Sequence, residues 1–185
     1  MDRRRRKTRA AIFSAFEGLL AERSYTSITV RDIIERADVG RTTFYDNFET
    51  KDDLLRELCE ELFDHVTSAA GERAHRDGQE GAGAPSVFLH LLQHLIEDSD
   101  NVLRLLAGES GGVFTRYFTD SLEELVSPRV SRAWAAEQDI PVDYLVDLAA
   151  GSFVEMVQWW VRGGLKQSPE ELDRWYRAAL GNVLA

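Results

Sequence analysis

The sequence predicts an all-α protein, on two observations. Apolar residues recur mainly three or four positions apart, and no stretch shows the apolar–polar alternation of a long strand. Proline is scarce, with 4 residues in 185, while 44% of the residues are hydrophobic and suffice for a core. We therefore expect an N-terminal three-helix unit joined by a long helix to a C-terminal helical bundle, with about nine helices in all.

The three N-terminal helices are defined by apolar stripes and by the residues that begin or end them. Their expected ranges are 8–23, 29–37 and 41–48. Thr29 is suited to cap the second helix, with Asp32 in place of the usual glutamate of a capping box. Gly40 lies in the following turn and can adopt a positive φ at little cost. Because only Phe44 and Phe48 of the short third helix face the core, this helix depends on its partners.

The remaining helices alternate with loops. Their expected ranges are 51–75, 86–97, 101–107, 113–126, 129–137, 141–162 and 168–184. Residues 71–85 contain four glycines among charged and small residues and form the clearest loop of the chain. The last helix has a strong start, with Ser168 as cap, Pro169 at the first position and acidic residues in the first turn.

Charge is distributed unevenly along the chain. The net charge is −10, but residues 1–51 carry 11 Lys and Arg against 8 Asp and Glu, whereas residues 52–185 carry 11 against 24. Five basic residues stand together in Arg3-Arg4-Arg5-Arg6-Lys7. Such a segment is typical of an arm that contacts an anionic polymer, and it is also typical of a solvated tail.

Cysteine usage and hydropathy exclude several classes. Cys59 is the single cysteine, so an internal disulfide or a cysteine-based metal site is excluded, which fits a reducing cytosol. The apolar stretch after the basic segment is interrupted by polar residues and lacks a small-residue cleavage site, so it is not a signal peptide. No run of 18 apolar residues is present. We therefore expect a cytoplasmic protein that does not span a membrane.

The outward face of the third helix indicates a function. With Phe44 and Phe48 directed inward, the residues left outside are Arg41, Thr42, Thr43, Tyr45, Asp46 and Asn47. Their hydroxyl, guanidinium, phenol and amide groups are those that hydrogen-bond phosphates and base edges. An ordinary helical corner with a hydrated face would share this pattern. The basic segment in the same unit favours a helix-turn-helix with 41–48 as recognition helix.

Three runs of residues carry a resemblance to a known family. They are Thr29-Val30-Arg31-Asp32-Ile33-Ile34, then Ala37-Asp38-Val39-Gly40-Arg41-Thr42-Thr43-Phe44-Tyr45, then Phe48 with Lys51-Asp52-Asp53-Leu54-Leu55. Over about residues 8–55 the chain resembles the TetR family of transcriptional regulators. It departs from the family pattern where Asp38 replaces the usual Gly and Gly40 the usual Ser. Since Asp tolerates the left-handed conformation and Gly caps nearly as well as Ser, neither departure argues against DNA binding.

The resemblance implies a function and a set of contacts. A protein of this kind is expected to be a repressor that binds a palindromic operator in double-stranded DNA as a homodimer and is released by a small molecule. The phosphate contacts implied are Thr29, Thr43, Tyr45 and Lys51, and the base contacts are Arg41, Thr42 and Asn47. Arg3, Arg4, Arg5 and Arg6 are expected to reach phosphates or an adjacent minor groove. No enzymatic activity, cofactor or metal is expected.

The resemblance also divides the chain into a DNA-binding domain over residues 1–50 and a ligand-binding and dimerisation domain over 51–185. Residues 150–172 are similar to the TetR subgroup that includes regulators linked to dihydroxyacetone kinase, from which only the architecture is carried over. The helix 142–162 is apolar nearly all round, which favours a four-helix interface in a two-fold dimer over a monomeric core. The interface residues expected are Leu145, Leu148, Trp159, Leu172, Trp175, Tyr176 and Leu180.

A pocket for a small apolar or aromatic ligand is expected between the fourth helix and the middle helices. The candidate lining residues are Phe63, Val66, Phe88, Leu92, Leu95, Leu106, Phe114, Phe118, Phe153 and Trp160. An aromatic stripe of this kind also forms an ordinary core, and both interpretations stay open at this point.

Two other functions stay open as well. The first is a DNA-binding regulator whose C-terminal domain binds a protein partner, as a co-activator does. The second is a metal-dependent all-α enzyme, because His90 and His94 share one helix face at i, i+4 spacing and could ligate a metal. Cys59 has no evident base beside it, so a buried structural role is expected rather than redox sensing.

Overall fold

The computed structural model describes residues 3–77, 86–97, 100–109 and 112–184, with the side chains of residues 69–77, 100 and 109 left out. These residues form ten α helices and no β-strand beyond an isolated antiparallel bridge between Val130 and Leu184. The helices are α1 (Arg3–Glu22), α2 (Val30–Ala37), α3 (Arg41–Tyr45), α4 (Asp52–Asp77), α5 (Val87–Glu97), α6 (Asp100–Arg104), α7 (Val113–Val126), α8 (Arg132–Glu137), α9 (Val142–Arg162) and α10 (Pro169–Leu180). The all-α prediction is confirmed.

Four short segments of 3₁₀ or π helix connect or extend these α helices. They are the 3₁₀ segments η1 (Tyr25–Ser27), η3 (Ser127–Arg129) and η4 (Gly181–Val183) and the π-helical segment η2 (Leu105–Glu109). None of the helices in the described part of the chain is long and apolar enough to cross a membrane.

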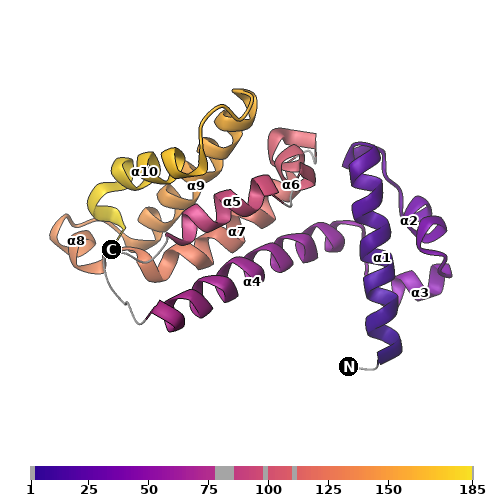
Figure 1. Cartoon of the computed structure of the whole chain (residues 1–185). Helices are drawn as coiled ribbons and strands as arrows, with labels where there is room; N and C mark the ends of the chain where they lie inside the picture. Colours follow the sequence, from indigo (N-terminus) through magenta and orange to yellow (C-terminus); the bar gives the residue numbers. More distant parts are fainter. Residues whose placement is uncertain (1–2, 78–85, 98–99, 110–111, 185) are drawn as a thin grey trace.

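The molecule consists of a small head and a larger bundle (Figure 1). In the head, α2 and α3 pack on one side of α1, and Phe16, Ile33 and Phe44 are fully buried between them. Helix α4 leaves the head and runs along the bundle, where it packs against α5 and α7. Helices α9 and α10 lie on the far side of the bundle from α4. One continuous hydrophobic core extends from Ile12 in the head to Val183 near the C-terminus.

The structure corrects the predicted start of the first helix. Helix α1 begins at Arg3 rather than Thr8, since Arg and Lys are good helix formers and nothing in residues 3–7 breaks the helix. The basic residues therefore lie on the surface of a helix, and those described do not form an extended arm.

Helix α3 is shorter than predicted. It ends at Tyr45, and the next two residues form a turn, whereas the helix was predicted to continue to Phe48. The Asn47 side-chain amide donates to the Thr43 carbonyl at 2.7 Å, a local side-chain bond of the kind that competes with continued helix. Phe48 nevertheless remains buried against Phe44, as predicted, with ring centroids 5.9 Å apart.

Further boundaries differ from the predictions, and one of them is the start of α8, which lies at Arg132 rather than Arg129. Helix α4 continues to Asp77, so the first part of the predicted 71–85 loop is helical, and its remainder, residues 78–85, lies outside the described residues. The predicted helix 101–107 changes to π-helical geometry at Leu105, and Gly108 in that segment has a φ of 110°. The last α helix ends at Leu180, because Gly181 adopts a φ of 45°.

Candidate nucleic-acid interface

The turn between α2 and α3 is fixed by local chemistry. Thr29 caps α2: its hydroxyl oxygen accepts from the Asp32 backbone N–H, and the Asp32 carboxylate accepts from the Thr29 backbone N–H at 2.8 Å. Asp38 ends α2 in the left-handed conformation, with φ 52° and ψ 48°. Both features follow the sequence-based predictions. Gly40 does not use the positive φ that it could adopt, because Asp38 already makes the reversal, and Gly40 is the extended N-cap of α3, in agreement with its predicted role as a cap.

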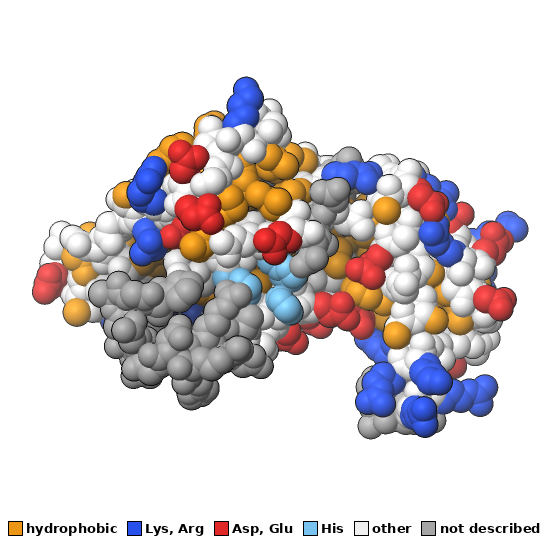
Figure 2. Space-filling view, viewed as in Figure 1, with side chains coloured by type: hydrophobic (Ala, Val, Ile, Leu, Met, Phe, Trp, Pro, Cys, Tyr) orange, Lys and Arg blue, Asp and Glu red, His pale blue; other side chains and the backbone are white. Residues whose placement is uncertain are grey.

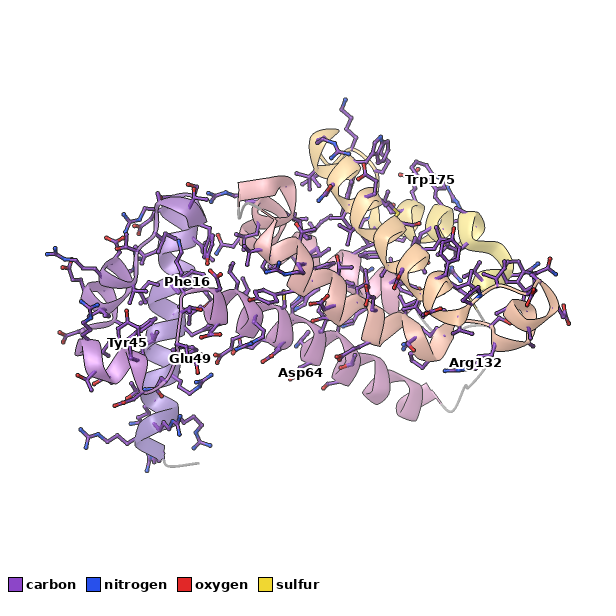
Figure 3. The ribbon with its side chains drawn as sticks, turned by 180° about the vertical axis from the view of Figure 1, so that it is seen from behind. Phe16, Tyr45, Glu49, Asp64, Arg132 and Trp175 are labelled. Atoms are coloured by element: carbon purple, nitrogen blue, oxygen red, sulfur yellow. The ribbon has the colours of Figure 1, made fainter. Side chains whose placement is uncertain are left out.

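The face of α3 directed away from the core is open to solvent. Arg41, Thr42 and Tyr45 are exposed, and Thr43 is half-buried. The Arg41 guanidinium lies 5.6 Å from the centre of the Tyr45 ring, a distance compatible with a cation–π contact. Figure 3 shows Tyr45 on the outer surface of the head. Guanidinium, hydroxyl and phenol groups on one exposed helix face can reach both base edges and phosphates.

The N-terminal half of α1 places positive charge beside α3. Arg3, Arg4, Arg5 and Arg6 are all exposed, and Lys and Arg side chains gather at the foot of α1 (Figure 2). An open cleft of about 420 Å³ separates α1 from α3 and is lined by Arg4, Arg5, Thr8, Thr43, Asp46 and Asn47. The Arg5 guanidinium crosses this cleft and donates to the Asp46 carbonyl at 3.2 Å. A phosphate beside α3 would therefore meet cationic groups from a second helix.

Besides Arg5, the predicted DNA contacts Thr29, Asn47 and Lys51 have internal partners. The Thr29 hydroxyl donates to the Asp32 carboxylate at 2.7 Å. The Asn47 amide N–H donates to the Thr43 carbonyl, and its amide oxygen is buried without a hydrogen-bond partner among the described residues. The Lys51 ammonium donates to two backbone carbonyls, those of Tyr25 at 3.0 Å and Ile28 at 2.8 Å. These side chains help to hold the head together, and the Thr29 hydroxyl, which has one proton, could donate to DNA only by giving up its bond to Asp32.

The environment of Lys51 shows what its charge does inside the head. The ammonium lies 4.1 Å from the centre of the Tyr25 ring, and partial burial lowers the pKa of Lys51. The Tyr25 hydroxyl donates to the Asp52 carboxylate, and burial together with that carboxylate raises the pKa of Tyr25 well above its usual range. Lys51 and Asp52 thus fasten the start of α4 to the η1 segment.

Four of the predicted interface residues are not available for a partner. Leu145, Leu172, Tyr176 and Leu180 are buried within the chain. Tyr176 shows why: its hydroxyl donates to the Ala149 carbonyl at 2.9 Å, and its ring packs edge-on against Phe88 and Phe153. The apolar residues on this side of α9 and α10 fill the chain's own core.

The opposite side of α9 and α10 carries an exposed apolar face. Its large apolar side chains are Tyr144, Leu148 and Trp159 of α9 and Trp175 of α10, and the exposed Glu155–Arg162 ion pair of α9 lies on the same side of that helix. The Trp159 and Trp175 rings meet edge-to-face at 6.4 Å and join the two helices into one surface. Gly151 lies between Leu148 and Trp159 on α9, and the space where its side chain would be is open. Figure 3 shows Trp175 on the outer side of α10. The periodicity of Tyr144, Leu148 and Gly151 could have identified this face from the sequence.

The predicted pocket residues form part of the closed core. All ten are at most 6% exposed. Their rings pack against one another, as in Phe63 with Phe118 at 5.1 Å and Phe88 with Phe153 at 5.9 Å, and the Trp160 indole donates to the Gln167 carbonyl. Only Phe63 lines one of the open clefts described, a space of about 550 Å³ between α4 and α7. The structure brings these residues together in the core of the bundle.

Three histidines form a cluster, of which the sequence indicated His90 and His94 but not His65. His65 of α4 stacks on His94 of α5 with ring centroids 4.4 Å apart, and His90 lies 6.1 Å from His65. The planes of His90 and His94 are 6° apart. Near-parallel rings direct their nitrogen lone pairs along parallel planes rather than to one point. The described residues hold no group of three or more His, Cys, Asp or Glu side chains that could hold a metal ion.

Cys59 is buried, and this burial raises the pKa of its thiol well above its usual range, so the reactive thiolate is suppressed. The structural role expected for this residue agrees with that environment.

Two side chains of α6 connect the bundle to the far end of α1. The Asn101 amide donates to the Glu17 carbonyl at 3.3 Å, and the Arg104 guanidinium donates to the Leu20 carbonyl at 3.0 Å. The Leu20 carbonyl lies in the last turn of α1, where helical partners run out. In turn the Gln158 amide of α9 donates to the Leu106 carbonyl in η2, next to α6.

Comparisons with known proteins agree with this geometry. Residues 12–58 match the family described as bacterial regulatory proteins of the tetR family, and residues 84–175 match a transcriptional regulator C-terminal region. A helix-turn-helix transcriptional regulator of Bacillus subtilis, YxbF, is 40% identical over 75 residues, which are 38% of this chain and 20% of that protein. The chain spans between 20% and 57% of the length of the first curated relatives that it matches.

Solved structures extend the likeness to the whole chain. The TetR transcriptional regulator from Streptococcus agalactiae is 33% identical, with a TM-score of 0.68, over 97% of this chain and 96% of that one. The FadR repressor of Thermus thermophilus, solved with lauroyl-CoA, is 20% identical, with a TM-score of 0.60, over 96% and 95% of the two chains. The second likeness concerns the fold alone.

Proposed function

The chain belongs to the TetR family of transcriptional regulators. From this premise we propose that it is a repressor that binds a palindromic operator as a homodimer and that a small molecule releases it from the DNA. The observation that carries the DNA-binding part is the exposed polar face of α3 beside the basic surface of α1. Residues 1–50 would form the DNA-binding domain and residues 51–185 the domain for dimerisation and ligand, in the cytoplasm.

Arg41, Thr42, Thr43 and Tyr45 are the proposed contacts of α3 in the major groove. Arg41 is the candidate for bidentate recognition of a guanine, and the hydroxyl groups are suited to bases or phosphates. Arg3, Arg4 and Arg6 would contact phosphates from the side of α1. Thr29, Asn47 and Lys51 are assigned to holding the head in shape, because their polar groups have partners within it.

The exposed face of α9 and α10 is the proposed dimer interface. A face with two tryptophans and a tyrosine in contact with water is unfavourable in a monomer and is typical of a covered surface. Gly151 would let the two copies of α9 approach closely. A two-fold dimer through this face would join two heads, as a palindrome requires.

A ligand would bind within the bundle, beside α4. FadR, a repressor of the same fold, was solved in complex with lauroyl-CoA, which supports the proposal that this chain also binds a small molecule. The tightly packed rings of Phe63, Phe114 and Phe118 would have to separate to admit an apolar or aromatic molecule.

We also propose that residues 150–172 place the chain near the subgroup linked to dihydroxyacetone kinase. Those residues form the end of α9, the turn after it and the capped start of α10.

The experiment that tests this function is selection of random duplex DNA by the purified protein at about 0.15 M salt, where non-specific binding is limited. An enriched near-palindrome is expected with the wild-type chain. Arg132→Ala, which removes an exposed cation from the bundle, should enrich the same sequence. Failure of the wild-type chain to enrich any sequence would refute the proposal.

A further inference from the structure

The recognition helix is short, and the end of it is held by side chains of α1. Helix α3 has five residues, so most of its carbonyls have no partner within the helix. The carbonyls of Asp46 and Asn47, in the turn that follows, accept from Arg5 at 3.2 Å and from Arg9 at 2.7 Å. Arg5 and Arg9 are four residues apart and therefore lie on one face of α1. They form two adjacent supports under the C-terminal end of α3.

Arg9 differs from Arg5 because it also binds α4. Its second guanidinium nitrogen lies 2.6 Å from the Glu57 carboxylate, and the guanidinium carbon lies 4.3 Å from the centre of the Phe48 ring. The side chains of Arg9 and Glu57 are 27% and 21% exposed, so water screens this pair less than a surface pair. One guanidinium thus connects α1, the end of α3 and α4.

The position of Arg9 sets it apart from the arginines that face solvent at the start of α1. Arg9 lines an open cleft of about 610 Å³ between the head and α4, together with Asn47, Phe48, Glu49, Asp53, Arg56, Glu57 and Glu60. Four of these residues are acidic, which disfavours the approach of a phosphate from this side. The donors of Arg9 are directed to a carbonyl and a carboxylate of the protein.

We propose that Arg9 is a positioning residue for operator recognition, which fixes the angle of α3 through Asn47 and is itself held by Glu57. This inference rests on the proposed DNA-binding function and assigns Arg9 no contact with DNA. Because Glu57 belongs to α4, the same bridge passes a change in the tilt of α4 to the recognition helix.

The test compares Arg9→Met with Arg6→Met, an exposed arginine on the same helix, using the operator selected by the wild-type chain and a scrambled duplex. Arg9→Met should lower affinity for the operator by about tenfold or more, as expected for the loss of charge-assisted hydrogen bonds. It should leave affinity for the scrambled duplex unchanged. The slope of log K against log salt should also stay unchanged, whereas Arg6→Met should reduce that slope by about 1.

A second pair of variants keeps the test valid where Arg9→Met lowers the stability of the head. Glu57→Gln keeps the size of the side chain and should reduce the preference for operator over scrambled duplex, while the exposed Glu60→Gln should not. Combining Arg9→Met with Glu57→Gln should add little to the loss caused by Arg9→Met, since both changes break one bridge. Circular dichroism at the binding temperature confirms that each variant is folded.

Two results would overturn the inference. One is a salt slope that falls by about 1 in Arg9→Met, which would make Arg9 a phosphate contact. The other is an unchanged preference for the operator in both Arg9→Met and Glu57→Gln. If the wild-type chain selects no operator, the proposed function fails first, so the two failures are distinguishable.

Discussion

The exposed tryptophan pair on α9 and α10 leads to a quantitative prediction about dimerisation. Trp159 is 46% exposed in the single chain. Taking about 250 Å² for a whole tryptophan, its exposed part is roughly 115 Å². At about 25 cal/mol per Å² its burial is worth up to about 3 kcal/mol. In a two-fold dimer the residue occurs twice, so the upper limit is about 6 kcal/mol per dimer.

Trp159→Ala should therefore weaken the dimer substantially without unfolding the chain. Alanine keeps part of the buried area, so we expect a loss of roughly 2 to 5 kcal/mol, or about 30-fold to several-thousand-fold in the dimer dissociation constant. Sedimentation equilibrium over a range of protein concentrations measures this constant. Operator binding should become dependent on protein concentration in the same range.

The control is Ile96→Ala, which removes an exposed apolar side chain from α5, outside the proposed interface. Its dimer dissociation constant should match that of the wild-type chain. If Trp159→Ala forms dimers as tightly as the wild-type chain, the interface lies elsewhere and the area argument for this face is refuted.

Three further predictions concern the head. Arg41→Ala should lower operator affinity by roughly 1–3 kcal/mol and relax the base preference at one position of each half-site, as measured by repeating the selection; an unchanged selected sequence would contradict its role. Lys51→Met should lower the stability of the head by about 1–3 kcal/mol through the loss of two charged hydrogen bonds, and thermal unfolding measures this, with an unchanged salt slope of DNA binding separating it from a phosphate contact. The hydroxyl and backbone N–H of Thr29, with Arg23, lower the pKa of Asp32, so the ionised carboxylate stabilises the folded head. This stabilisation is present above about pH 4 and is lost as pH falls through the lowered pKa; Asp32→Asn should therefore destabilise the chain at neutral pH and have a smaller effect in acid, and an effect that grows in acid would refute it.

Local features of the head were predictable because short-range chemistry determines them. The capping box of Thr29 and Asp32 and the left-handed Asp38 require only neighbouring residues. The start of α1 was misplaced because the arginines, which were interpreted as a tail, are also good helix formers.

The partners of side chains distant in the sequence were not predictable. Apolar periodicity showed that Leu145 and Trp159 both lie on an apolar helix, but it could not show that one faces the chain's own core and the other faces solvent. Arg9 and Glu57 are separated by 48 positions, and neither belongs to a local pattern. The phosphate contact of Lys51 was expected from the family resemblance, and its two carbonyl partners, also remote in sequence, could not be predicted.

The attachments of α1 determine how the head can move. Two helices of the bundle hold α1: α4 through Glu57 at Arg9, and α6 through Asn101 at the Glu17 carbonyl and Arg104 at the Leu20 carbonyl. With a rise of about 1.5 Å per residue, Arg9 and Leu20 are roughly 16 Å apart along the axis. If α4 and α6 shift by about 2 Å relative to each other across that axis, α1 tilts by roughly 7°. The head then turns as a rigid body, and the separation of two recognition helices in a dimer changes without any rearrangement inside either head.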